Sequence, residues 1–158
     1  MARSAGRFRR RASWRIRFWD ASNYIEVSAG PLSASAGRKT MAPQIETKRV
    51  YDLPSPEDGA RILVDRLWPR GVGKDAAALD HWAKDVAPTA ELRKWFGHKP
   101  ERFDEFERRY RAELAHNPNI DALRDYAKRG RITLLYAAHD PRINNAHVLA
   151  AYLRKKWR

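Results

Sequence analysis

The sequence contains no cysteine, which excludes disulfides, thiolate metal sites and cysteine nucleophiles together and fits a reducing compartment. No apolar run approaches the roughly 20 residues that a membrane helix needs. A glycine-rich phosphate loop and a His-x-x-x-His pair are absent as well. These absences predict a cytoplasmic protein with no membrane segment, no cofactor and no metal ion.

Apolar bulk and positive charge are abundant, but the charge is distributed unevenly. The 158 residues include six Trp, six Tyr and five Phe, enough for one domain with a hydrophobic core. Of the net charge of +13, residues 1–40 contribute +7, from nine basic and two acidic side chains. This distribution predicts a disordered basic extension over residues 1–43, followed by a single α/β domain over residues 44–158.

The N-terminal extension is rich in Arg, Ser, Ala and Gly and has no sustained hydrophobic period, so it cannot bury an apolar face. Three interpretations remain open. It is a basic arm for nucleic acid, or an organelle-targeting segment, or the product of an upstream start codon with Met41 as the natural start.

Apolar runs predict three strands, over residues 44–51, 61–67 and 132–140, the last two buried on both faces. Residues 79–86 fit either a helical stripe or a short strand before Pro88. Helical periodicity and capping residues predict four helices, over residues 89–97, 100–116, 117–130 and about 146–157. The pattern is typical of a small three-layer α/β domain, with a mostly parallel sheet flanked by helices.

Polar clusters follow three apolar segments: Asp65, Arg66, Arg70 and Lys74, then Lys84 and Asp85, then His139, Asp140, Asn144 and Asn145. The carboxyl ends of parallel strands meet at one edge of a sheet, so we expect these clusters to share a rim. Arginine forks suit carboxylate or phosphate, and a helix N-terminus favours an anion. The predicted partner is therefore an anionic small molecule, including a nucleotide.

Within this rim, Arg66 and Arg70 are predicted to clamp the anion. The further candidate ligand-binding residues are Lys84, Asp140, Asn144, Asn145 and Trp68. The candidate catalytic residues are His139, Asp65 and Asp85. His139 and Asp140 are adjacent on a predicted strand and would point to opposite faces, so Asp65 or Asp85 would be the better carboxylate partner. No cofactor fingerprint is visible, which favours hydrolysis or group transfer over redox chemistry.

Simpler structural roles compete with each assignment. Asp65 and Arg66 would form an ion pair at a strand end, Asn144 would cap a helix, and Trp68 would belong to the core. A second class of function is nucleic-acid binding or regulation through the basic tail and surface, and a third is contact with a protein partner alone. The candidate basic surfaces are Arg108, Arg109 and Arg111, and Arg154, Lys155, Lys156 and Arg158.

Three blocks, LVDRLWPRG, KDVAPTAELRKWFGH and TLLYAAHDPRINNAHVLAAYL, resemble those of the domain-of-unknown-function 488 family in its YeaO-like branch, over about residues 49–153. The resemblance implies a small bacterial α/β domain without an established activity, whose members begin near Val50. The wider family often carries a cysteine in the last strand and another after it, so its thiol chemistry cannot operate here. The matched polar positions are Asp65, Arg66, Arg70, Lys84, Asp85, His139, Asp140, Asn144 and Asn145.

Overall fold

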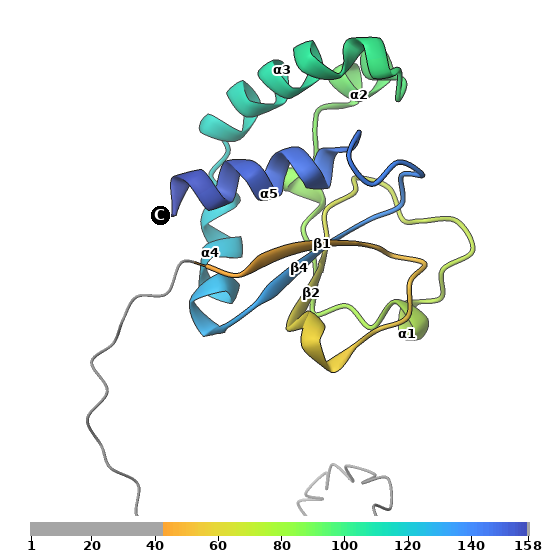
Figure 1. The fold of residues 1–158 in the computed structure, drawn as a ribbon, viewed down its shortest axis with the longest axis vertical. Helices are drawn as coiled ribbons and strands as arrows, with labels where there is room; N and C mark the ends of the chain where they lie inside the picture. Colours follow the sequence, from red (N-terminus) through yellow and green to blue (C-terminus); the bar gives the residue numbers. More distant parts are fainter. Residues whose placement is uncertain (1–42, 158) are drawn as a thin grey trace, which may run out of the picture. The chain divides into compact units, whose positions relative to one another are not determined.

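A four-stranded parallel sheet organises residues 43–157, the part of the chain that this computed structural model describes (Figure 1). The strands are β1 (Ile45–Arg49), β2 (Ala60–Leu63), β3 (His81–Trp82) and β4 (Ile132–Tyr136), in the order β1-β4-β2-β3. The predicted α/β class is confirmed, and every strand pair is parallel. The predicted extension lies outside the described residues, except for Pro43.

Strand β4 occupies the centre of the sheet between β1 and β2. Ile132 pairs with Ile45 on one side and with Ala60 on the other, and all five residues of β4 are buried. A strand with two neighbours and two covered faces is apolar along nearly its whole length, which explains the run ITLLY. The strand is shorter than the predicted 132–140, because the N–H of Ala137 donates to the Asp65 carboxylate rather than to a neighbouring strand.

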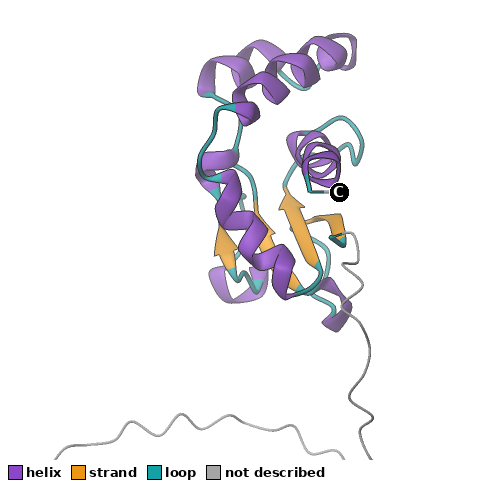
Figure 2. Ribbon diagram, turned by 90° about the vertical axis from the view of Figure 1, so that its left-hand side faces the viewer, coloured by secondary structure: helices purple, strands orange, loops and turns teal. Residues whose placement is uncertain are grey.

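Helices cover one face of the sheet (Figure 2). They are α2 (Ala90–Phe96), α3 (Phe103–Ala115), α4 (Ile120–Arg129) and α5 (Asn145–Lys156). Phe106, Tyr110 and Leu114 recur every four residues along α3 and are almost fully buried. They join Ile62 and Leu134 of the sheet in the larger hydrophobic cluster, so this face carries the main core.

The other face has a thinner cover. Leu63 and Leu135 pack with Val50 and with Ala77 of the short helix α1 (Lys74–Ala77), and Trp68 borders this smaller cluster. Three short 3₁₀ turns complete the described elements: Pro56–Asp58, Lys84–Val86 and Pro100–Arg102. The three layers are therefore unequal, with four helices on one side and one helical turn plus a long loop on the other.

Helix boundaries follow local capping chemistry. The Thr89 hydroxyl accepts a hydrogen bond from the N–H of Leu92 at 3.3 Å, and α2 ends at Gly97 with a φ of 52°, both as predicted. The ambiguous segment 79–86 contains the short strand β3 rather than a helix. The N–H of Ala83 extends this pairing by donating to the Leu63 carbonyl at 2.8 Å.

The amino ends of β2 and β4 are held by a buried ionic cluster around Asp58. Lys48 and Arg61 both pair with its carboxylate, the former at 2.9 Å. The hydroxyl of Thr133 donates to the Asp58 carbonyl at 2.6 Å. Burial opposes ionisation, but hydrogen bonds from Lys48, the N–H of Ser55 and Arg61 outweigh it and lower the pKa of Asp58.

Gly59 makes the close approach between β2 and the turn before β4. Its φ of 63° lies in the left-handed region, and a Cβ atom there would stand 2.1 Å from the carbonyl oxygen of Arg131. The N–H of Ala60 donates to that same carbonyl at 3.0 Å. No helix among residues 43–157 combines the length and apolar character needed to cross a bilayer.

Candidate functional site

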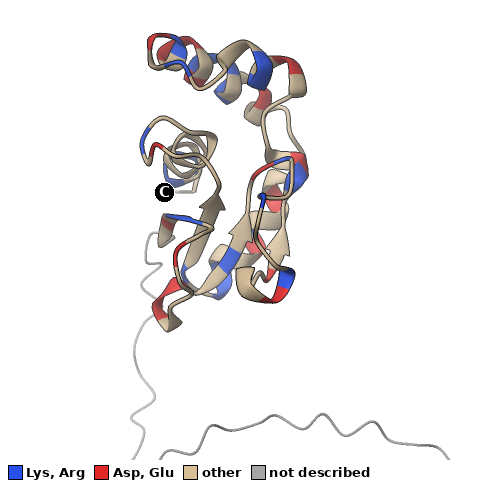
Figure 3. Cartoon of the chain, turned by 90° about the vertical axis from the view of Figure 1, so that its right-hand side faces the viewer, with Lys and Arg blue, Asp and Glu red and all other residues tan. Residues whose placement is uncertain are grey.

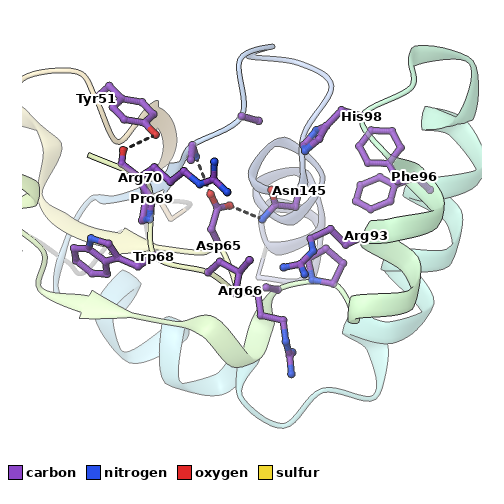
Figure 4. A pocket seen from close by; sticks show the side chains of 16 residues that line it. Tyr51, Asp65, Arg66, Trp68, Pro69, Arg70, Arg93, Phe96, His98 and Asn145 are labelled. Carbon is purple, nitrogen blue, oxygen red and sulfur yellow. Dashed lines mark hydrogen bonds between the residues drawn. The ribbon is translucent and has the colours of Figure 1, made fainter. Parts of the chain in front are cut away.

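A cavity of about 450 Å³ lies beyond the carboxyl ends of β2 and β4 (Figure 4). The loop that follows β2 forms one wall, residues 137 and 138 after β4 form the floor, and Asn145 enters from the start of α5. The opposite wall comes from α2 and its flanking segments. This is the edge of a parallel sheet where ligands generally bind, and it is the edge chosen from the sequence.

Asp65 occupies the centre of the cavity and is held by two neutral donors. The N–H of Ala137 donates to one carboxylate oxygen at 2.8 Å, and the side-chain amide of Asn145 donates to the other at 3.2 Å. The same amide donates to the Val64 carbonyl at 3.0 Å. Among residues 43–157 no ion pair joins Asp65 to Arg66 or to any other cation, so the strand-end ion pair weighed as an alternative role does not form.

The environment of Asp65 disfavours its charged form. Burial raises the pKa of this carboxyl above its usual value of 3.8. The N–H of Ala137, the amide of Asn145 and the more distant charges of His98 and Arg93 act in the opposite direction without cancelling the effect of burial. A partly buried acid without a direct cationic partner is therefore exposed to the cavity.

Positive side chains surround this acid. Arg70 extends toward Asp65 from the loop after β2, while Arg93 and His98 approach from the α2 side (Figure 4). Arg66 points away from Asp65 in the same view, toward a second cavity of about 350 Å³ that it shares with Asp85. Arg66 and Arg70 both line the cavity, but only Arg70 extends toward Asp65, so the predicted clamp stays a prediction; Arg93 and His98 line the same cavity.

His98 and Arg93 were not among the residues selected from the sequence. Gly97 and His98 both have positive φ, 52° and 55°, so the chain reverses sharply where α2 ends. The imidazole ring lies 5.4 Å from the ring of Phe96. The only sequence signal for this wall is the block KDVAPTAELRKWFGH, which contains both residues.

Aromatic side chains close the cavity. Phe96 and Phe106 stack with ring centroids 4.2 Å apart and are nearly inaccessible, so they shape the wall from behind. Trp68 packs edge-on against Trp82 at 5.4 Å and donates its indole N–H to the Val72 carbonyl at 2.8 Å. Trp68 therefore has the structural role weighed for it as well as a place in the lining.

The remaining selected residues lie outside this cavity. His139 is exposed beyond the end of β4, and Lys84 and Asp85 are exposed in the turn after β3. One oxygen of Asp140 accepts the N–H groups of Arg142 and Ile143 at 2.7 and 3.0 Å, which lowers the pKa of its carboxyl.

Asn144 is fully buried and caps α5. Its side-chain oxygen accepts the N–H of His147 at 2.9 Å, and its side-chain amide donates to the Asp140 carbonyl at 2.8 Å. Of the selected residues, the structure brings together Asp65, Arg66, Trp68, Arg70 and Asn145. Residues 43–157 contain no cluster of His, Asp and Glu side chains arranged to hold a metal ion.

The arginines of α3 are neutralised by acids on the same helix (Figure 3). Arg108 and Arg109 pair with Glu105 at 2.7 and 2.6 Å, and Arg111 pairs with Glu107 at 2.6 Å. The two arginines lower the pKa of Glu105 to about 2. Figure 3 shows acidic and basic positions interspersed along α2 and α3 rather than a continuous basic strip.

Comparison with known proteins identifies the family. Residues 44–158 match the model described as the inactive DUF488-N3 subclade. The chain belongs to the DUF488 family. The uncharacterized protein YeaO of Escherichia coli is 49% identical over 111 residues, covering 70% of this chain and 96% of the relative. Uncharacterized proteins of Mycobacterium tuberculosis and Mycobacterium bovis are 44% identical over 110 residues, covering 70% of this chain and 93% of each relative. No solved structure matches the chain.

The DUF488 resemblance and the cavity coincide. The block LVDRLWPRG contributes residues 65–70, the block KDVAPTAELRKWFGH contributes the α2 wall, and the third block contributes residues 137, 138 and 145. Of the lining residues, Tyr51 and Phe106 alone lie outside these blocks. The three segments by which the family was recognised are therefore the three walls of one site.

Proposed function

We propose that this DUF488 domain binds a small molecule bearing a carboxylate or phosphate group in the cavity beyond β2 and β4. The observation that carries the proposal is the charge of the lining. Arg66, Arg70, Arg93 and His98 line the cavity together with a single carboxylate, Asp65. Guanidinium groups bind carboxylate and phosphate oxygens through paired hydrogen bonds, and a partly enclosed site strengthens that attraction.

The dimensions of the cavity fit this class of ligand. Its volume of about 450 Å³ falls within the range of small-molecule sites, roughly 300–1,000 Å³, and suits a small carboxylic acid, a sugar phosphate or a mononucleotide. Apolar walls from Phe96 and Leu67 lie beside the charged groups, as is usual where a few polar groups orient a bound molecule.

Binding is favoured over the hydrolase or transferase alternative. The description of the matching subclade as inactive counts against catalysis. His139 and Asp85 do not line the cavity, which leaves Asp65 as the candidate catalytic residue that does. The nucleic-acid alternative gains no support from α3, because its arginines are paired with glutamates.

The test is a thermal-shift screen of the full chain against succinate, glutamate, inorganic phosphate, glucose 6-phosphate and AMP. A ligand at about 100 times its Kd stabilises the native state by roughly 2.7 kcal/mol, which is an easily measured rise in Tm. We expect a hit whose Kd rises about tenfold or more in Arg70→Ala and in Arg93→Ala, since each removes a charge-assisted hydrogen bond.

The matched control is Lys94→Ala, which removes an exposed cation from α2 beside Arg93 but outside the cavity. It should keep the wild-type affinity. Absence of any hit would refute the proposal, and so would an equal loss of affinity in the control, because the binding would then reflect general surface charge. A hit that instead requires residues 1–40 would support the basic-arm interpretation.

A further inference from the structure

The acid at the centre of this cationic cavity is difficult to reconcile with a ligand that is only an anion. Asp65 lines the cavity, and its carboxylate would repel a second negative group placed among Arg70, Arg93 and His98. The fixed donors Ala137 and Asn145 use one position on each oxygen. A carboxylate has about four acceptor positions, so roughly two remain for a bound molecule.

The position of Asp65 is also fixed. It lies two residues after the end of β2. Its oxygens are held by the backbone after β4 and by the first residue of α5, and its own carbonyl accepts the indole N–H of Trp82 at 2.8 Å. Three elements therefore hold an acceptor at one place in the cavity, while the arginines reach it from other walls. A ligand that carries both a hydrogen-bond donor and an acidic group could place the donor at Asp65 and the acidic group at the arginines.

We propose that Asp65 makes the cavity selective for anions that also carry an amino group, with amino acids as the simplest class. This inference rests on the proposed function, since the acid group of the ligand would occupy the arginine side of the cavity. The amino group would donate to the Asp65 oxygens, which turns a repulsive neighbour into a binding partner. A hydrogen bond between charged groups changes affinity by about tenfold or more.

The first test compares ligands that differ only by the amino group: glutamate with glutarate, and phosphoethanolamine with ethyl phosphate. Titration calorimetry of the full chain should give at least about tenfold tighter binding for the amino-bearing member of the pair that fits. In Asp65→Asn this preference should fall to within about threefold, mainly because the simple anion binds more tightly once the repulsion is removed.

The matched control is Asp104→Asn, the same substitution at an exposed acid in the first turn of α3, outside the cavity. It should leave the preference unchanged. Far-ultraviolet circular dichroism and the melting temperature of each variant establish that the fold is retained.

A second measurement needs no substitution. The charged and titratable groups that line the cavity with Asp65 are Arg70 from its own loop, Arg93 from α2 and His98 from the following turn, together with Arg66, which points away from Asp65; Asn145 on α5 is neutral. A simple anion beside Asp65 should take up a proton on binding, and an amino-bearing anion should not. The Kd of the simple anion, divided by the Kd of the amino-bearing anion, should therefore grow as the pH rises.

The outcomes separate this inference from the proposed function. If anions bind and Arg70→Ala weakens them, but the amino group confers no preference or Asp65→Asn leaves the preference intact, Asp65 does not select the ligand. If neither member of either pair binds but the thermal-shift screen gives another anionic hit, this inference fails and the proposed function stands; if the screen gives no hit either, both fail. A preference that is lost in Asp65→Asn and kept in Asp104→Asn establishes it.

Discussion

Each end of the sheet holds an aspartate close to arginines, but the two acids are compensated in opposite ways. At the amino end, Lys48 and Arg61 pair directly with Asp58, and the pKa of this carboxyl is lowered. At the carboxyl end, neutral donors hold Asp65, the cations stand off, and its pKa is raised. Nearby arginines alone therefore do not indicate whether an aspartate stabilises the fold; a direct ion pair, as at Asp58, does.

The spaces around the two acids differ as well. A cavity of about 270 Å³ at the amino end is lined by Glu46, Glu57, Asp58, Lys48 and Arg131, so acids and bases are mixed there. The carboxyl-end cavity of about 450 Å³ has four basic side chains and one acid. We infer that the amino end is built for stability and the carboxyl end for binding.

The largest effect should come from Asp58→Asn. It leaves Arg61, which is only 4% exposed, without its buried counter-ion, and breaking such a pair costs about 3–5 kcal/mol. Guanidinium unfolding should show a lower midpoint with an unchanged slope. The double variant Asp58→Asn with Arg61→Met should recover part of this loss. If Asp58→Asn alone kept near wild-type stability, the inference that Asp58 stabilises the fold would be wrong.

Asn144→Ala should have an intermediate effect, although Asn144 lies at the same end of the sheet as Asp65. It removes the cap of α5 and a partly buried hydrogen bond to the Asp140 carbonyl, for an expected cost of about 1–2 kcal/mol. Anion affinity should stay within about twofold, because Asn144 does not line the cavity. Urea unfolding and calorimetry separate the two readouts, and a tenfold loss of affinity would assign Asn144 to the site.

Asp65→Asn should change stability least of the three, by about 1 kcal/mol or less. The amide oxygen keeps one of the two hydrogen bonds, and the loss of the other is offset by removal of a buried charge. Denaturant unfolding of Asp65→Asn and Asp58→Asn under the same conditions checks this difference. If both variants lost several kcal/mol of unfolding free energy, both acids would have a structural role.

The two acids should also give pH dependences of opposite sign. The pKa of Asp58 is lowered, so its stabilising effect is present above the usual value of 3.8 and is lost as the pH falls toward its folded pKa. The pKa of Asp65 is raised, so its ionisation destabilises the fold as the pH rises from 3.8 through the folded pKa.

Unfolding of the wild-type chain and both variants between pH 3 and 7 measures these differences. The loss of unfolding free energy in Asp58→Asn should shrink at the acid end of this range. The stability of Asp65→Asn relative to the wild type should be highest at neutral pH. If the unfolding free energies of the two variants changed with pH in the same way, the opposite pH dependences expected for the two acids would be wrong.

Local chemistry made much of the fold predictable. The capping hydroxyl of Thr89 and the stop at Gly97 are short-range signals, and they gave α2 its bounds. The buried run in β4 and the choice of the sheet edge at its carboxyl end, where the cavity lies, follow from rules about parallel sheets. These rules led to the selection of Asp65, Arg70 and Asn145 as candidate site residues.

Long-range contacts made the rest unpredictable. β4 ends at Tyr136 because Ala137 bonds to Asp65, 72 residues away, and this leaves His139 outside the cavity. The directions of Arg66, Arg93 and His98 depend on how the loop and α2 pack, which periodicity does not encode. The strand β3 has only two residues and carries too little pattern to be separated from a helical stripe.

The strand order has a consequence for biosynthesis. β1 and β2 do not pair with each other; each pairs with β4, whose first residue follows that of β1 by 87 positions. In a chain emerging from the ribosome, β2 has β3 as an early partner, but β1 stays unpaired and one edge of the apolar β2 stays open until nearly all of the domain has been made. The central strand of the sheet is added in a late step, so nascent chains stalled before Ile132 should be the form most in need of chaperones.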